Sequence, residues 1–141
     1  CNSFDFVNIP VQTTVDLVAN ILNSITSANA HLNTVTTISA FHSRAIPSIS
    51  IQAYLTRILK FAPFHSECLI SLLIYLDRIQ EVSIQRNYRF ALTSYNIHRL
   101  LITGVLVASK FQSDVFYPNS RYAKVGGLPV NELNKLELEF L

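Results

Sequence analysis

Cysteine, which can bind metals and act in covalent catalysis, occurs only twice in this sequence of 141 residues, and glycine only three times. Cys1 and Cys68 lack the close spacing of metal-ligating cysteines, and Cys68 lies in an apolar run typical of a buried helix. There is no CxxC, GxSxG or Walker motif, and Gly126-Gly127 lacks the Lys-Ser/Thr of a phosphate-binding loop. The two glycines therefore indicate a turn, and we expect no catalytic site.

The histidines do not supply a metal site either. They have neither the i, i+4 pairing nor the cysteine neighbours that zinc sites show, and they are His31, His42, His65 and His98. A helical enzyme with an unmarked acid and base stays open as an alternative, although no motif points to it. We expect neither a metal ion nor a cofactor.

Long hydrophobic runs are also absent. The longest, Leu69 to Leu76 and Leu100 to Ala108, are far shorter than the roughly 20 residues that cross a bilayer. The sequence contains no basic segment followed by an apolar signal core and no Asn-x-Ser/Thr acceptor. We expect a chain without membrane attachment, located in the cytoplasm, the nucleus or both.

Charged residues make up only 14% of the chain, whereas half of its residues are hydrophobic, so we expect a partner to cover some apolar surface. The charge is also uneven. Residues 1–40 contain no Lys or Arg, and residues 86–124 contain six basic residues against the single acid Asp114. This basic region is open to three interpretations: ordinary solvated surface, contact with a phosphate-bearing partner, or contact with nucleic acid.

Apolar residues at helical spacing, with no convincing alternation typical of strands, predict an all-α chain. One buried stripe of Val15, Leu17, Val18, Ile21, Leu22 and Ile25 predicts an N-terminal helix. Residues 33–49 read as a connecting segment. Pro129 suits the first turn of a last helix that ends at Leu141. The N-terminal helix is predicted over Thr13–His31. The helices between it and the last one are predicted over Ser50–Ala62, Ser66–Glu81 and Ser94–Lys110, with Ser94 as the cap of the third of these.

The segment Ser94–Lys110 is hydrophobic nearly all round, so we expect it at the centre of the helical core. Gly104 falls in its interior, where glycine costs about 1 kcal/mol relative to alanine. Such a glycine is expected where a second helix packs against the backbone.

Four motifs in register carry a family resemblance: YLDR at 75–78, NIHRLLITGVLVASKF at 96–111, YAKVGG at 122–127 and LELEFL at 136–141. Together they resemble the cyclin box, and in particular the phosphate-regulon or P-type/U-type cyclins. The resemblance implies an all-α fold, a single cyclin-box five-helix domain at residues 40–141. Residues 1–39 would hold an additional N-terminal helix and the connecting segment.

The resemblance also implies a non-catalytic regulatory subunit that binds and activates a cyclin-dependent protein kinase. In cyclins, a lysine after the Ala-Ser of the third box helix and a glutamate of the fifth hydrogen-bond the backbone near the kinase's movable helix. Lys110 and Glu137 match these positions, with Glu137 preferred over Glu139. The alternative is a helix-terminal lysine and an exposed glutamate without a partner.

Further kinase contacts are implied at Phe111, Asp114 and Leu141. Phe111 could instead be a core residue, and Asp114 a turn residue. Arg121 and Lys124 are candidates for contact with a phosphate, the activation segment or a substrate.

One region departs from many cyclins. Asp77 and Arg78 are predicted to form a structural ion pair at a helix end. Ile49–Ala53 stands where other cyclins carry an apolar docking motif, which makes substrate recruitment there doubtful. The alternative function is a transcription adaptor with a cyclin-like fold that binds nucleic acid, although such adaptors usually have two boxes and a zinc ribbon.

Overall fold

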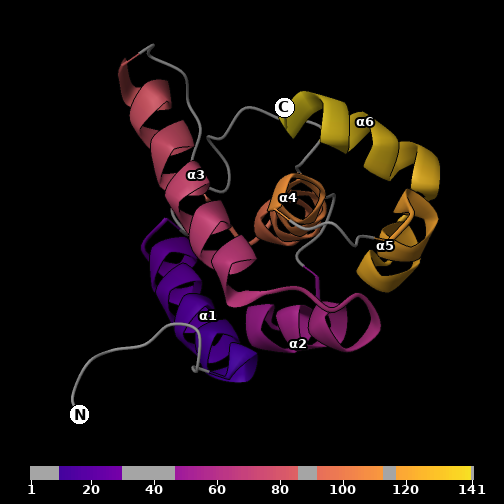
Figure 1. Ribbon diagram of the computed structural model, residues 1–141. Helices are drawn as coiled ribbons and strands as arrows, with labels where there is room; N and C mark the ends of the chain where they lie inside the picture. The colour runs from indigo at the N-terminus through magenta and orange to yellow at the C-terminus, as the bar shows by residue number, and fades with distance from the viewer. Residues whose placement is uncertain (1–9, 30–46, 86–91, 113–116, 141) are drawn as a thin grey trace.

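The computed structural model describes residues 10–29, 47–85, 92–112 and 117–140, and all regular structure in these ranges is α-helical. Figure 1 shows α4 end-on at the centre, surrounded by the other helices. The all-α prediction is confirmed. The helices are α1 (Val11–Ala28), α2 (Ile51–Phe61), α3 (Ser66–Gln85), α4 (Ile97–Gln112), α5 (Asn119–Gly126) and α6 (Val130–Phe140).

The predicted central helix is confirmed as α4, which contacts α2, α3, α5 and α6. Its side chains are buried on all sides, as a helix without a polar face requires: Ile97, Leu100, Leu101, Ile102, Val105, Leu106 and Val107. Gly104 faces α3, and a Cβ atom at this position would collide with the side chain of Leu72. Glycine therefore allows the close approach of α3 to α4, as its place in the sequence predicted.

The starts of α2 and α4 show one correct and one wrong cap prediction. Ser50 caps α2, because its side chain accepts a hydrogen bond from the backbone N–H of Ala53 at 3.1 Å. Ser94, however, does not cap α4. The Asn96 side chain accepts from the Thr93 N–H at 2.9 Å, and the Thr93 hydroxyl accepts from the Tyr95 N–H at 3.3 Å. These two residues satisfy the turn, and the helix begins later, at Ile97.

The N-terminal helix α1 packs against α2 and α3. Its buried stripe contains Val15, Val18 and Leu22, but Leu17 and Ile21 are 60% and 37% exposed. The prediction of one stripe with all six apolar residues was therefore wrong, since Leu17 and Ile21 lie on a neighbouring face of the helix. The division of the chain at residue 39 stays a prediction.

Helix α5 completes the predicted set of five helices plus one, although the pattern of apolar residues had not given its bounds. Gly127 ends it with φ of +75°, a left-handed conformation that glycine adopts without strain. The turn predicted from Gly126-Gly127 thus directs the chain back into α6. The Tyr54 hydroxyl of α2 donates to the Gly126 carbonyl at 2.9 Å and ties α5 to α2.

His98 is explained by packing. Its Nε2 lies 2.7 Å from the Ile49 carbonyl oxygen, and its ring meets the Tyr54 ring edge-on with centroids 5.0 Å apart. Burial lowers the pKa of His98 and outweighs the hydrogen bond to Ile49, which raises it. The neutral imidazole therefore links α4 to the start of α2.

Helix α3 runs past the predicted end at Glu81 to Gln85. Asp77 and Arg78 consequently lie in the helix interior, both exposed to solvent. In the described part of the chain, neither takes part in an ion pair. The predicted helix-end ion pair was wrong, because adjacent residues on a continuous helix point to different sides.

Candidate functional site

Lys110 and Glu137, which are 27 residues apart in sequence, form an ion pair where α4 ends. Lys110 Nζ lies 2.8 Å from Glu137 Oε2. The lysine is in the last turn of α4, where the unsatisfied carbonyls favour a cation. Asn119, at the first position of α5, donates to Glu137 Oε1 at 2.9 Å. One carboxylate therefore holds three helices together.

The Glu137 carboxylate is stabilised in its charged form. Burial raises the pKa of this carboxyl, but the hydrogen bonds from Lys110 and Asn119 together hold the pKa below its usual value. The side chains of Lys110 and Glu137 keep 31% and 17% of their surface exposed. The Glu137 carboxylate is thus held in its charged form, and the pair is still accessible to a partner.

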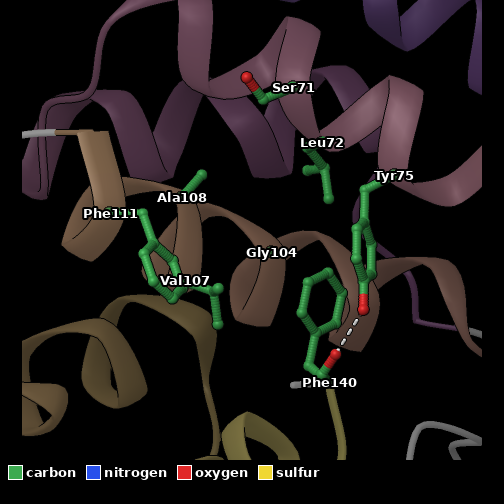
Figure 2. Close-up of a pocket in the computed structure, with 8 residues that line it drawn as sticks. All are labelled: Ser71, Leu72, Tyr75, Gly104, Val107, Ala108, Phe111 and Phe140. Atoms are coloured by element: carbon green, nitrogen blue, oxygen red, sulfur yellow. Dashed lines mark hydrogen bonds between the residues drawn. The ribbon is translucent and has the colours of Figure 1, made fainter.

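An apolar groove of about 260 Å³ lies between α3, α4 and α6, next to this ion pair. Figure 2 shows the residues that line it, with the Tyr75 and Phe140 rings at one end and Phe111 at the other. Tyr75 stacks on Phe140 with ring centroids 4.7 Å apart and donates its hydroxyl to the Phe140 carbonyl oxygen at 2.7 Å. The lining residues are Ser71, Leu72, Tyr75, Gly104, Val107, Ala108, Phe111 and Phe140.

The residue after each member of the ion pair is apolar and exposed. Phe111 is 77% exposed and Leu138 is 76% exposed. Phe111 is therefore not a core residue of this chain, which removes the alternative left open by the sequence. Large apolar side chains that keep this much contact with water, beside a groove, are typical of an interaction surface.

A second ion pair joins the same two helices where they begin. The guanidinium of Arg99, in the first turn of α4, contacts the carboxylate of Glu132, in the first turn of α6. Here the following residues, Leu100 and Leu133, are 2% and 0% exposed. The Arg99 and Glu132 side chains themselves are 25% and 35% exposed, so this pair is as accessible as the first. It differs in that the residues following its members are buried.

The remaining predicted site residues are distributed differently. Asp114 and Leu141 lie outside the described residues. Arg121 and Lys124 lie on α5 and line a separate pocket with Arg57 of α2. Lys110, Phe111 and Glu137 are therefore the predicted site residues that the structure brings together.

Two residues of the site were missed by sequence reasoning. Asn119 was missed because an amide after a proline carries no motif of its own, although Pro118-Asn119 does mark the start of a helix. Tyr75 was quoted only as part of YLDR, and its position in the groove depends on the crossing of α3 and α6. Its aromatic ring, three residues after Leu72 and one before Leu76 in an apolar helical run, was the available signal.

The described residues offer no alternative centre for metal chemistry, since no three His, Cys, Asp or Glu side chains among them are close enough to share an ion. Within the same ranges, none of the helices has the length and apolarity needed to cross a membrane.

Comparison with known proteins agrees with this architecture. The family described as Cyclin matches residues 11–141. The PHO85 cyclin-like protein psl1 of Schizosaccharomyces pombe is 58% identical over 100 residues, which is 71% of this chain and 40% of that protein.

Two further relatives come from a budding yeast and a plant. PHO85 cyclin-7 of Saccharomyces cerevisiae is 41% identical across 97% of this chain and 55% of its own length. Cyclin-U4-1 of Arabidopsis thaliana is 46% identical over 104 residues, 74% of this chain and 50% of its own length. The chain thus spans about half the length of the curated relatives it matches. The cyclin family match covers most of the chain, the helices form a bundle around α4, and the relatives above are PHO85 and plant U-type cyclins. The chain therefore belongs to the cyclin family, in the branch of the PHO85 cyclins and the plant U-type cyclins.

Proposed function

We propose that this chain is a regulatory subunit that binds and activates a cyclin-dependent protein kinase and carries out no catalysis itself. The observation that carries the proposal is the Lys110–Glu137 ion pair, 2.8 Å long, beside an exposed apolar groove. Two relatives of this chain are named as PHO85 cyclins, and this favours a kinase of the PHO85 kind as the partner.

The ion pair has hydrogen-bonding capacity left for a partner. An ammonium group has three donors, and Lys110 gives one of them to Glu137. The Glu137 carboxylate accepts one bond from Lys110 and one from Asn119, which leaves lone pairs unused. In the proposed complex, Lys110 donates to backbone carbonyls before the kinase's movable helix, and Glu137 accepts from a backbone N–H there.

The groove supplies the apolar part of the interface. Phe111 follows Lys110, lines the groove and exposes most of its surface, so a docked helix would remove it from water. Burying an aromatic anchor beside a paired charge is typical of the energetic centre of a protein interface. We propose that apolar side chains of the kinase helix enter the groove between Tyr75 and Phe111, and that Asp114 and Leu141 extend the contact.

Activation follows from a difference in affinity. A subunit that binds the active arrangement of the kinase helix better than the inactive one shifts the kinase equilibrium by that difference. In the active arrangement, the helix glutamate pairs with the active-site lysine and helps to orient the ATP phosphates. The chain thus contributes binding energy rather than reacting groups, and we propose that it acts where such kinases act, in the cytoplasm, the nucleus or both.

The test is reconstitution with purified cyclin-dependent kinases of the source organism, measured as phosphate transfer to a protein substrate. We expect no activity from the chain alone and a large stimulation of one kinase by the wild-type chain. Lys110→Glu should abolish the stimulation. Lys60→Glu, the same substitution at an exposed position of α2 that does not line the groove, is the matched control and should retain it. If no kinase is stimulated or bound by the wild-type chain, the proposed function is wrong.

A further inference from the structure

A second cavity, separate from the groove, is lined by residues of α2 and α5 and by positive charge. Figure 1 shows these two helices beside each other. It has a volume of about 350 Å³. The lining residues are Arg57, Phe61, Arg121, Lys124 and Val125. Three of these five carry a full positive charge and none carries a negative one.

One of the three cations is held in place by its surroundings. Arg121 Nε donates to the backbone carbonyl of Phe61 at 2.7 Å, and the guanidinium lies 4.0 Å from the centre of the Tyr117 ring. These contacts fix the plane of the guanidinium and leave its two terminal nitrogens available. A preorganised fork of this kind suits two oxygens of one anion.

The other two cations reach the same cavity from different helices. Arg57 and Lys124 are exposed, and the described part of the chain provides no carboxylate in an ion pair with either. Three cations gathered without a counter-charge repel one another, and a bound anion relieves that repulsion. By contrast, Arg99 and Lys110 each pair with a glutamate.

We propose that this cavity binds the phosphate group of a phosphorylated serine or threonine in a protein segment. Arg121 provides the bidentate contact, and Arg57 and Lys124 neutralise the remaining charge of the phosphate. Phe61 is 48% exposed at the edge of the cavity, where it can pack against the residues beside the phosphorylated one. This goes beyond the proposed kinase activation and does not depend on it, because none of the residues that line the cavity lines the groove or takes part in the ion pair.

The confined shape favours a protein segment over nucleic acid. Duplex DNA is held by many phosphate contacts along a continuous basic track. Three cations, Arg57, Arg121 and Lys124, line this one cavity, and an aromatic and an aliphatic side chain, Phe61 and Val125, complete its wall. One phosphate with flanking side chains fits this arrangement.

The experiment follows the Arg Nε–H signals of the free chain by NMR, first with inorganic phosphate and then with a short peptide library that contains a fixed phosphoserine. The matched library has unmodified serine at that position. We expect the Arg57 and Arg121 signals to shift with phosphate and to saturate at lower concentrations of the phosphopeptides. Unmodified peptides should cause no shift.

The variant Arg57→Gln/Lys124→Gln removes two cations that form no ion pair with any described residue, so the fold should persist. Because each lost charge-assisted contact weakens binding by about tenfold, phosphopeptide affinity should fall by at least that factor. Arg78→Gln/Lys135→Gln removes the same charge from exposed positions elsewhere and should bind like wild type.

Several results would overturn the proposal: absence of a shift, equal losses in both double variants, or peptides that bind no better than inorganic phosphate. Tighter binding of duplex DNA than of phosphopeptides at the same sites would assign the cavity to nucleic acid instead. Because these measurements contain no kinase, a negative result leaves the proposed kinase activation untouched.

Discussion

The two ion pairs between α4 and α6 have the same charges and different surroundings. Arg99–Glu132 joins the starts of the two helices, and the residue after each of its members is buried in the core. Lys110–Glu137 lies near their other ends, and there the following residues, Phe111 and Leu138, are more than three-quarters exposed. Both pairs are partly exposed, so the difference lies in the residues that follow them in the chain, and the exposed Phe111 lines the apolar groove.

The helix dipoles sharpen this difference. Arg99 lies in the first turn of α4, where the positive end of the helix disfavours a cation, so Glu132 offsets an unfavourable position. Lys110 lies in the last turn, where a cation is favoured without any partner. Lys110 therefore needs Glu137 less for the stability of the chain, which is consistent with a role outside the fold.

The largest expected effect is on the exposed pair. Lys110→Glu places two carboxylates together and removes the proposed donor, so kinase affinity should fall by about 3 kcal/mol or more, roughly a hundredfold. Isothermal titration with the kinase identified by reconstitution measures it. Lys60→Glu should leave the affinity within about twofold of wild type, since Lys60 is exposed on α2 and belongs to neither the groove nor an ion pair of the described residues. Unchanged binding of Lys110→Glu would separate the pair from the kinase.

Truncation of the exposed aromatic should come next. Phe111→Ala should reduce kinase affinity by about 2 kcal/mol, as loss of an interface anchor does. Because Phe111 contacts water in the free chain, its unfolding free energy should change by only about 0.5 kcal/mol. Ile74→Ala, at an exposed position on α3 outside the groove, is the matched control and should alter neither quantity. A large loss of stability with intact binding would mark Phe111 as structural.

Asn119→Ala should have a moderate effect, because it removes one of the two hydrogen bonds to Glu137. We expect about 1 kcal/mol of destabilisation in urea unfolding. The pKa of Glu137 should rise toward its ordinary value, which an NMR titration of the carboxyl carbon can follow. A pKa that stayed in place would mean that Lys110 alone stabilises the carboxylate.

The smallest effect concerns pH. Since the pKa of Glu137 is lowered in the folded chain, its contribution to stability is present above the unfolded value of about 4.3 and is lost as pH falls through the folded value. The difference in unfolding free energy between wild type and Glu137→Gln should be constant near neutral pH and shrink below about pH 4. Lys110→Gln should flatten this dependence, because it removes one cause of the lowered pKa; an unaltered curve would contradict that.

The fold was predictable where a residue type allows few alternatives. The apolar run of α4 permits only a central position, and Gly104 predicts the close contact with α3. The start of α4 was not predictable from Ser94, because the neighbouring Thr93 and Asn96 are capping residue types as well. In the structure their side chains, not that of Ser94, accept hydrogen bonds from backbone N–H groups of this turn. The bounds of α5 also depended on Gly127 adopting a left-handed conformation, which many glycines do not.

The candidate site was predictable only in part. The family resemblance identified Lys110 and Glu137, and the structure joins them, but spacing alone gives no reason for residues of different helices to meet. Asn119 and Tyr75 belong to the site because α5 and α3 each meet α6 there. No local sequence pattern encodes these helix contacts. The cationic cavity has the same origin: Arg57 is far in sequence from Arg121, and only the packing of α2 on α5 unites them.

The most direct test of the account compares two charge swaps, Lys110→Glu/Glu137→Lys and Arg99→Glu/Glu132→Arg, in affinity for the kinase by titration calorimetry. Each swap preserves an ion pair between α4 and α6, so both variants should fold, which circular dichroism checks. We predict that the first swap loses kinase binding, since donor and acceptor have changed places, and that the second binds like wild type. Equal affinities of the two variants for the kinase would contradict the assignment of the Lys110–Glu137 pair to the interface.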